Sequence, residues 1–141
     1  MPIRVAQAVW EGNLLHGKGN MSLESGAFEG KYSFSSRFEE GTGTNPEELI
    51  GAAHAGCFSM ALAHELDQAH YTPESIKTIA HVSLNKSNDG FAITEIELVT
   101  EAKVSDIQEK EFLEHAKNAK KNCPVSQALK GVSINLKATL I

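Results

Sequence analysis

The sequence lacks a hydrophobic run that could cross a membrane. Its least polar stretch, residues 49–63, is interrupted by His54 and by two glycines and is short for a bilayer span, so it predicts a buried helix instead. The first residues, Met1–Val5, show no apolar stretch followed by a small-residue cleavage site, so we expect no export signal. We therefore expect a cytoplasmic protein without a membrane partner.

Long runs of like charge are absent too. Lys and Glu alternate along the chain, and 13 basic against 18 acidic residues give a formal net charge of −5. Nucleic acids and anionic membranes bind basic faces, so neither is expected as the main partner. The length of 141 residues is enough for one compact domain over residues 1–141 and leaves no room for a second.

Cysteine is scarce, with only Cys57 and Cys123 in the chain. They stand too far apart for a local Cys-x-x-Cys motif, and without clustered histidines or carboxylates they do not predict a structural zinc site. In a cytoplasmic protein a static structural disulfide is unusual. The pair therefore indicates redox chemistry or two thiols without any chemical role.

The order of helical and strand patterns along the sequence predicts an α+β fold, with a largely antiparallel sheet covering helices. A cap at Asn45, with Glu48 reaching back to it, predicts the start of a long helix. An Asn-Asp-Gly turn between two alternating runs predicts a hairpin, with Thr94 among the inward-facing residues. The expected strands are 3–10, 19–23, 31–38 (ending in Arg37), 76–84, 94–104 and 132–140, and the expected helices are 45–69, 105–121 and 124–129.

The long helix predicts the oligomeric state. Apolar residues surround its middle on nearly every side, as in a helix that is buried all round. A single sheet covers only one side of it. A second copy of the chain is the simplest cover for the other side, so we expect a homodimer with this helix central to the interface.

Cys57 lies about three turns into this helix and shares a face with His54, three residues earlier. One interpretation is a small apolar core residue without chemistry. The mid-helix position gives no pKa lowering of the kind found at a helix N-terminus, so a reactive Cys57 needs a cation from elsewhere. A Cys–His pair is also the minimal constellation of a thiol hydrolase, and His54 can equally donate a hydrogen bond within the core or interface.

Cys123 precedes Pro124, which disfavours helical dihedrals at Cys123 and favours an N-cap position before a short helix. A thiol there is expected to face free backbone amides, which favour the thiolate. The alternative is a capping residue without chemistry. On local physics alone, Cys123 is predicted to be the more acidic of the two thiols.

Two charged residues complete the candidate set. Arg37 precedes a flexible loop, where most arginines are surface residues. Glu47 lies in the first turn of the long helix. If Glu48 reaches back to the cap, Glu47 is free to face another partner, although its interaction with the helix dipole is a sufficient alternative reason for its presence.

Four segments resemble the OsmC branch of the OsmC/Ohr family. They are Arg37–Glu39 (RFE), Gly43–Leu62 (GTNPEELIGAAHAGCFSMAL), Gly90–Thr94 (GFAIT) and Asn122–Gln127 (NCPVSQ). The resemblance covers essentially the whole chain, and the paired cysteine motifs are highly specific. The place of the arginine, just before the long helix, is similar to the OsmC branch.

The resemblance implies an OsmC-like fold, an intertwined homodimer with an antiparallel sheet wrapped around long central helices. It also implies a stress-defence peroxidase that reduces organic hydroperoxides at the dimer interface. By position, Cys57 matches the peroxidatic cysteine and Cys123 the resolving one. Arg37 and Glu47 match the activating arginine and the glutamate that holds it.

On this interpretation the guanidinium of Arg37 is the missing cation beside Cys57. A Cys57 sulfenic acid condenses with Cys123 to a disulfide, which an external dithiol or lipoylated protein reduces, without a cofactor. An apolar pocket from Phe58, Met60 and partner-chain residues is expected to favour organic peroxides. Two alternatives stay open: a Cys57–His54 thiol hydrolase, and a structural or ligand-binding dimer with incidental cysteines.

Overall fold

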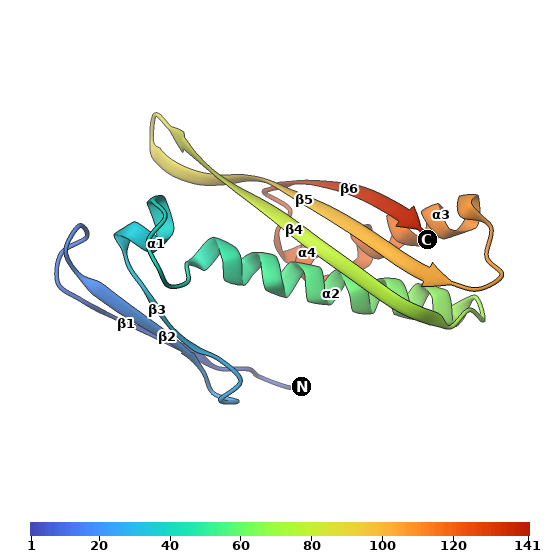
Figure 1. The fold of residues 1–141 in the computed structure, drawn as a ribbon, viewed down its shortest axis with the longest axis horizontal. Helices are drawn as coiled ribbons and strands as arrows, with labels where there is room; N and C mark the ends of the chain where they lie inside the picture. The colour runs from blue at the N-terminus through green and yellow to red at the C-terminus, as the bar shows by residue number, and fades with distance from the viewer. The chain divides into compact units, whose positions relative to one another are not determined.

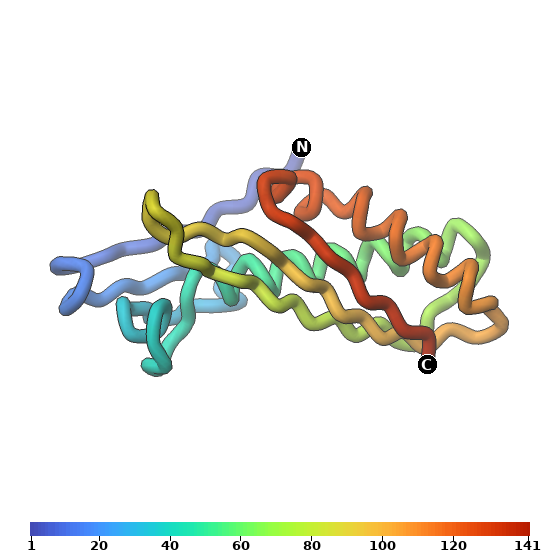
Figure 2. The backbone as a smooth tube through the Cα atoms, turned by 90° about the horizontal axis from the view of Figure 1, so that it is seen from above, coloured from blue at the N-terminus to red at the C-terminus, as the bar shows by residue number.

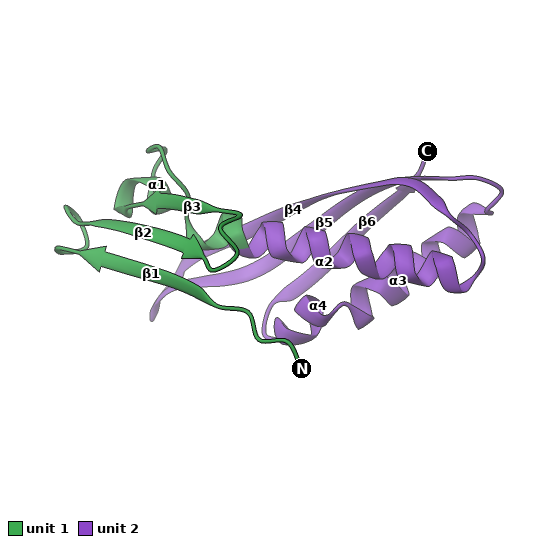
Figure 3. Cartoon of the chain, turned by 90° about the horizontal axis from the view of Figure 1, so that it is seen from below, with its two compact units in different colours: residues 1–49 green, residues 50–141 purple.

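The computed structural model describes all residues, 1–141, and shows the mixed α and β structure that the sequence predicts (Figure 1). The chain divides into two compact units, residues 1–49 and residues 50–141, coloured green and purple in Figure 3. The single domain over residues 1–141 stays a prediction. None of the helices is both long and apolar enough to cross a membrane.

The first unit is built on a three-stranded antiparallel sheet in the order β1-β2-β3. The rings of Trp10 and Tyr32 pack against each other on this sheet, tilted by 53° with their centroids 5.4 Å apart. A short helix follows the third strand. The bounds are β1 Ala6–Glu11, β2 Lys18–Leu23, β3 Glu29–Tyr32 and α1 Phe34–Phe38.

Arg37 lies on a helix, so the predicted strand over residues 31–38 is wrong. Ser33 and Ser36 form a reciprocal capping box: the Ser33 hydroxyl accepts from the Ser36 amide, and the Ser36 hydroxyl accepts from the Ser33 amide. Because a capping box satisfies free amides at the start of a helix, it favours the turn of the chain into α1 at Ser33. Arg37 is placed in the last turn of that helix.

The long helix α2 (Pro46–Gln68) spans the boundary between the two units. The Asn45 cap is confirmed, because its side-chain oxygen accepts from the Glu48 amide at 2.8 Å. The carboxylate of Glu48 does not reach back to Asn45; it accepts from the Thr44 hydroxyl at 2.8 Å, so that part of the predicted capping box is wrong. The helix ends before His70, which has a left-handed φ of 68°.

The second unit places helices on one face of a three-stranded sheet (Figures 1 and 2). Its strands β4 and β5 form the predicted antiparallel hairpin, and β6 pairs parallel with β5. The side chains between the sheet and the helices form the hydrophobic core, which includes Phe58, Leu62 and Phe112. The bounds are β4 Pro73–Ser87, β5 Gly90–Val104, α3 Glu109–Asn122, α4 Pro124–Ala128 and β6 Ser133–Leu140.

Two expectations within this unit are wrong in detail. Thr94 is exposed rather than inward, because the pairing register shifts between Ser83 and Leu84, so that Leu84 pairs with Ile93. A one-residue shift moves a side chain to the other face of a strand. Helix α3 begins at Glu109 rather than Ser105, after a turn in which Asp106 has a left-handed φ of 66°.

Candidate functional site

The two cysteines lie together in the second unit. Cys57 is on α2, and Cys123 is at the junction of α3 and α4, where it serves as the N-cap of α4. Neither is in a disulfide, and the Cys57 thiol lies within hydrogen-bonding reach of the Cys123 thiol. Cys57 is partly exposed, whereas Cys123 has an exposed fraction of 0%. A solute can therefore reach Cys57 more readily than Cys123.

The pKa of Cys57 is raised above the ordinary value of a thiol. Burial is the largest cause, and the Cys123 thiol adds to it as a hydrogen-bond partner and a second acidic group. The backbone N–H of Val125, in the first turn of α4, donates to the Cys57 sulfur and acts in the opposite direction. The thiolate of Cys57 is therefore partly stabilised by α4 but needs a positive charge as well.

This geometry corrects one expectation about Cys123. Its N-cap position before Pro124 is confirmed, with Pro124 in the first helical position. Its side chain makes no capping hydrogen bond, however, so it does not face the free amides of α4 as predicted. The Val125 amide faces Cys57 instead. The sequence places amides at this helix start, but only the packing of α4 on α2 decides which thiol receives them.

His54 has a partner other than Cys57. Its Nε2 atom lies 2.7 Å from the hydroxyl oxygen of Ser126 on α4, and both residues are buried. Burial lowers the pKa of His54, and His54 is not among the groups that shift the pKa of Cys57. The geometry therefore favours the hydrogen-bonding interpretation of His54 over the Cys–His pair of a thiol hydrolase.

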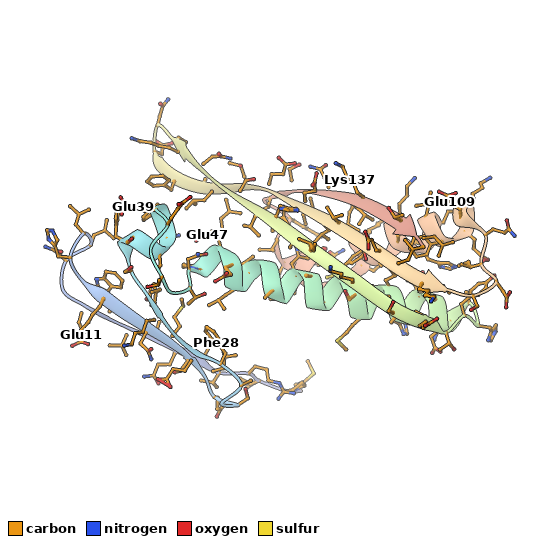
Figure 4. All side chains as sticks on the ribbon, in the orientation of Figure 1. Glu11, Phe28, Glu39, Glu47, Glu109 and Lys137 are labelled. Carbon is orange, nitrogen blue, oxygen red and sulfur yellow. The ribbon has the colours of Figure 1, made fainter.

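Arg37 and Glu47 form an ion pair in the first unit. Both Nε and Nη2 of Arg37 donate to the same oxygen of Glu47, at 3.0 and 2.7 Å. The Glu47 side chain is 9% exposed and the Arg37 side chain 37%; Figure 4 labels Glu47 at the start of α2. The prediction that Glu47 is free to face a partner is consistent with this pair. Nη1 of Arg37 takes no part in the pair and is available to another group.

An aromatic cavity adjoins Arg37 within the same unit. It has a volume of about 270 Å³, and Trp10, Tyr32, Phe34 and Phe38 contribute to its walls together with the arginine. This cavity could not be predicted from the sequence, because Trp10 on β1 is distant in the sequence from the residues of β3 and α1 that form the other walls. Aromatic residues around a cation form a site that suits an apolar molecule with one polar end.

The expectation that Phe58 lines an apolar substrate pocket is wrong. The Phe58 side chain has an exposed fraction of 0% and lies in the core of the second unit, among Leu62 and Leu66. It is therefore closed to a substrate. Met60 is 76% exposed, and its contact with a partner chain stays a prediction. No group of three or more His, Cys, Asp or Glu side chains has the geometry to hold a metal ion.

The four predicted site residues thus form two pairs. The structure brings Cys57 together with Cys123 in the second unit, and Arg37 together with Glu47 in the first. A partly exposed thiol on α2 beside a buried thiol at the start of α4 is an arrangement that suits a thiol-dependent enzyme.

Comparison with known proteins places the chain within that class. The family model described as OsmC-like protein matches residues 39–137, and the chain belongs to this family. It is 54% identical over 125 residues to Peroxiredoxin OsmC of Escherichia coli (strain K12), covering 88% of this chain and 87% of that protein. The organic hydroperoxide resistance protein OhrB of Bacillus subtilis (strain 168) is 34% identical to it over 116 residues, covering 80% of this chain and 82% of that protein.

A solved structure supports the fold as well. The OsmC-like protein from Mycoplasma pneumoniae superposes with a TM-score of 0.77 at 20% identity, covering 99% of this chain and 98% of that one. The predicted family, the OsmC-like fold class and the enzyme class, a cysteine-based peroxidase, are thereby confirmed.

Proposed function

We propose that the chain reduces organic hydroperoxides to alcohols, with Cys57 as the attacking thiol and Cys123 as the resolving thiol. The observation that carries the proposal is the contact between the two thiols, with the Val125 amide donating to Cys57. The relatives named peroxiredoxin and organic hydroperoxide resistance protein support it. The stress-defence role and the cytoplasmic location, a reducing compartment in which such a thiol pair can cycle, belong to the same proposal.

The order of the two cysteines rests on access and on hydrogen bonding. A peroxide can approach the partly exposed Cys57, whereas Cys123 is fully buried. The Val125 amide favours the thiolate of Cys57, and Cys123 has no capping contact with α4. Both observations support Cys57 as the first thiol to react.

The proposed cation is Arg37. Burial and the neighbouring thiol both raise the pKa of Cys57, so an attacking thiolate at neutral pH requires compensation. The guanidinium of Arg37 is fixed by two hydrogen bonds to one oxygen of Glu47 and keeps Nη1 for a further contact. A planar, permanently charged group held in this way can pair with a thiolate and donate to a peroxide oxygen.

The reaction then runs in three steps. The Cys57 thiolate attacks one peroxide oxygen, the O–O bond breaks, and the alkoxide takes a proton and leaves as the alcohol. The Cys123 thiol attacks the resulting sulfenic acid, so that an S–S bond forms, the S–O bond breaks and water leaves. An external dithiol, free or on a lipoylated protein, then reduces the disulfide by exchange and is itself oxidised.

The aromatic cavity beside Arg37 supports an organic rather than an inorganic peroxide. Its walls include Trp10, Phe34 and Phe38, which offer apolar surface to a carbon chain or ring. Hydrogen peroxide has no apolar group to bury there, so it gains none of this binding energy. We assign this cavity to the organic part of the substrate.

The test is peroxide consumption in the presence of a dithiol, with intact mass after one equivalent of cumene hydroperoxide. We expect Cys57→Ser to be inactive, Cys123→Ser to gain one oxygen, and the native protein to lose two hydrogens. An inert Cys123→Ser with an oxidised Cys57→Ser would reverse the two roles. A native protein that leaves the peroxide untouched would contradict the proposal, and ester turnover without a reductant would support the hydrolase.

A further inference from the structure

A buried hydrogen bond joins the same two helices that carry the two thiols. Nε2 of His54 on α2 and the hydroxyl of Ser126 on α4 are 2.7 Å apart. His54 has an exposed fraction of 0%, and Ser126 is also buried. The two residues are far apart in the sequence, so the bond holds one element on another rather than shaping a local turn.

The bond lies about one helical turn from the thiols. His54 precedes Cys57 by three residues on α2, and Ser126 follows Cys123 by three residues at the start of α4. Residues three apart share a helix face. The pairs His54–Ser126 and Cys57–Cys123 therefore form two neighbouring links between the same two segments.

Helix α4 needs such a link because it is short. It has five residues, Pro124–Ala128, and the exposed Lys130 and Gly131 lie between it and β6. A helix of this length has little stability of its own and depends on its tertiary contacts. Displacement of α4 from α2 would remove both Cys123 and the Val125 amide from Cys57.

We propose that His54 and Ser126 are positioning residues for the second step of the reaction, in which Cys123 captures the Cys57 sulfenic acid. This inference rests on the proposed peroxidase function. In that step the S–S bond forms as the S–O bond breaks, and the oxygen leaves as water with the proton of the Cys123 thiol. Because a disulfide requires a specific separation and orientation of its two residues, the rate depends on how well α4 is held.

The protonation state of His54 suits a fixed link to a neutral hydroxyl. Burial lowers its pKa, so the ring is neutral at neutral pH and bonds to the hydroxyl as one neutral group to another. Its second nitrogen, Nδ1, is buried without a partner. A buried polar side chain with half of its hydrogen-bonding capacity unused costs stability, which a leucine of similar size would avoid. The role that we assign to the remaining bond accounts for a histidine here.

The competing fate of the sulfenic acid provides the readout. If Cys123 does not capture it, a second peroxide converts it to sulfinic acid, which a dithiol does not reverse. The ratio of disulfide to sulfinic acid at a given peroxide concentration therefore measures the second step alone. The rate at which the first equivalent of peroxide is consumed measures the first step.

The experiment compares Ser126→Ala and the double variant His54→Leu/Ser126→Ala with the native protein, using cumene hydroperoxide, rapid quenching and intact mass. We expect first-step rates within about twofold and disulfide formation slower by about tenfold, the effect of losing one positioning hydrogen bond. The sulfinic fraction should rise accordingly. The amide group of a glutamine can reach the place of the His54 Nε2 atom and bond to Ser126. His54→Gln should therefore retain most of the native ratio of disulfide to sulfinic acid.

Thr100→Val is the matched control, because it removes a buried hydroxyl in the same unit whose hydrogen bonds go to Thr78 and Lys77 of β4 and not to α4. It should lower stability and leave the ratio unchanged. A native ratio in Ser126→Ala and in the double variant would overturn the inference and leave the peroxidase proposal intact. If the native protein forms neither sulfenic acid nor disulfide, the peroxidase proposal itself fails. If Ser126→Ala does not fold, the double variant provides the test instead, because replacing His54 by Leu leaves no ring nitrogen without a partner.

Discussion

The Cys57 thiol is subject to opposing influences at the scale of single residues. Burial and the Cys123 thiol raise its pKa, and the Val125 amide lowers it. None of these groups carries a positive charge. The balance within the second unit therefore disfavours the thiolate, and we propose that the guanidinium of Arg37 compensates for this.

Replacement of Arg37 by Met should move the pH dependence of peroxide attack to higher pH. An opposite charge nearby lowers the pKa of an acid, typically by about 1–3 units, so its removal raises the pKa of Cys57 by up to that amount. The attacking species is the thiolate, so the rate at neutral pH falls and recovers as the pH rises. The measurement is the single-turnover oxidation rate between roughly pH 5 and pH 10.

The chain offers a matched control in Arg4, its only other arginine, which is exposed. Arg4→Met changes the net charge equally and should leave the pH profile in place. The same profile in Arg37→Met and in the native protein would rule out Arg37 as the cation of Cys57. A uniform loss of rate at every pH would assign Arg37 to binding the peroxide rather than to activating the thiol.

At the scale of secondary structure, a chain of hydroxyl groups ties α2 to the sheet. Ser59 on α2 bonds to Thr78 on β4 at 2.8 Å, and Thr78 bonds to Thr100 on β5 at 2.9 Å. Thr100 also donates to the backbone carbonyl of Lys77 at 3.2 Å. Thr100 is fully buried, so these bonds lie at the boundary between the helix and the strands that hold it.

Thr100→Val should lower the free energy of unfolding by about 1–3 kcal/mol, since it removes a buried hydroxyl and leaves its partners with fewer hydrogen bonds. Urea denaturation followed by circular dichroism measures the change. Thr139→Val, at an exposed position of β6, is the control and should stay within about 0.5 kcal/mol of the native protein. Equal stability of the two variants would show that the buried hydroxyl chain does not stabilise the unit.

Several of the secondary-structure elements could be predicted from the sequence. The start of α2 at Asn45, the hairpin of β4 and β5, and the short helix after Pro124 follow from local signals, and the structure confirms all three. The sequence analysis predicts Arg37 on a strand, whereas the capping box of Ser33 with Ser36 starts a helix there. That signal is local and was available in the sequence.

Other features depend on contacts between distant segments and could not be read from the sequence. The register shift that exposes Thr94 arises from pairing with β4. The Val125 amide faces Cys57 rather than Cys123 because of how α4 packs on α2. The partner of His54 is Ser126, a residue of the motif around Cys123, yet nothing in the motif itself indicates which side chain its hydroxyl faces. Sequence identifies the candidate residues here, and packing assigns their roles.

At the scale of the whole molecule, α2 presents an apolar face that the rest of the second unit leaves exposed. Phe58 and Leu62 on one side of the helix are buried against the sheet, whereas Gly56 is exposed and Met60 is 76% exposed. The exposed Met60 next to the small Gly56 leaves room for another molecule to pack on this face of the helix. This agrees with the homodimer predicted from the sequence, in which the long helix is central to the interface.

Met60→Lys should weaken this dimer. A charged side chain buried without a partner at the centre of a symmetric interface would occur twice, so the two copies would repel each other as well as lose apolar contact. Sedimentation velocity over a range of concentrations should show a dimer for the native protein and dissociation of Met60→Lys at concentrations where the native protein stays paired.

Ile79→Lys is the matched control, because Ile79 on β4 is also an exposed apolar residue, 45% exposed, but lies outside α2. It should sediment as the native protein does. A native protein that sediments as a monomer, or a Met60→Lys variant as tightly paired as Ile79→Lys, would show that this face of α2 is not the dimer interface.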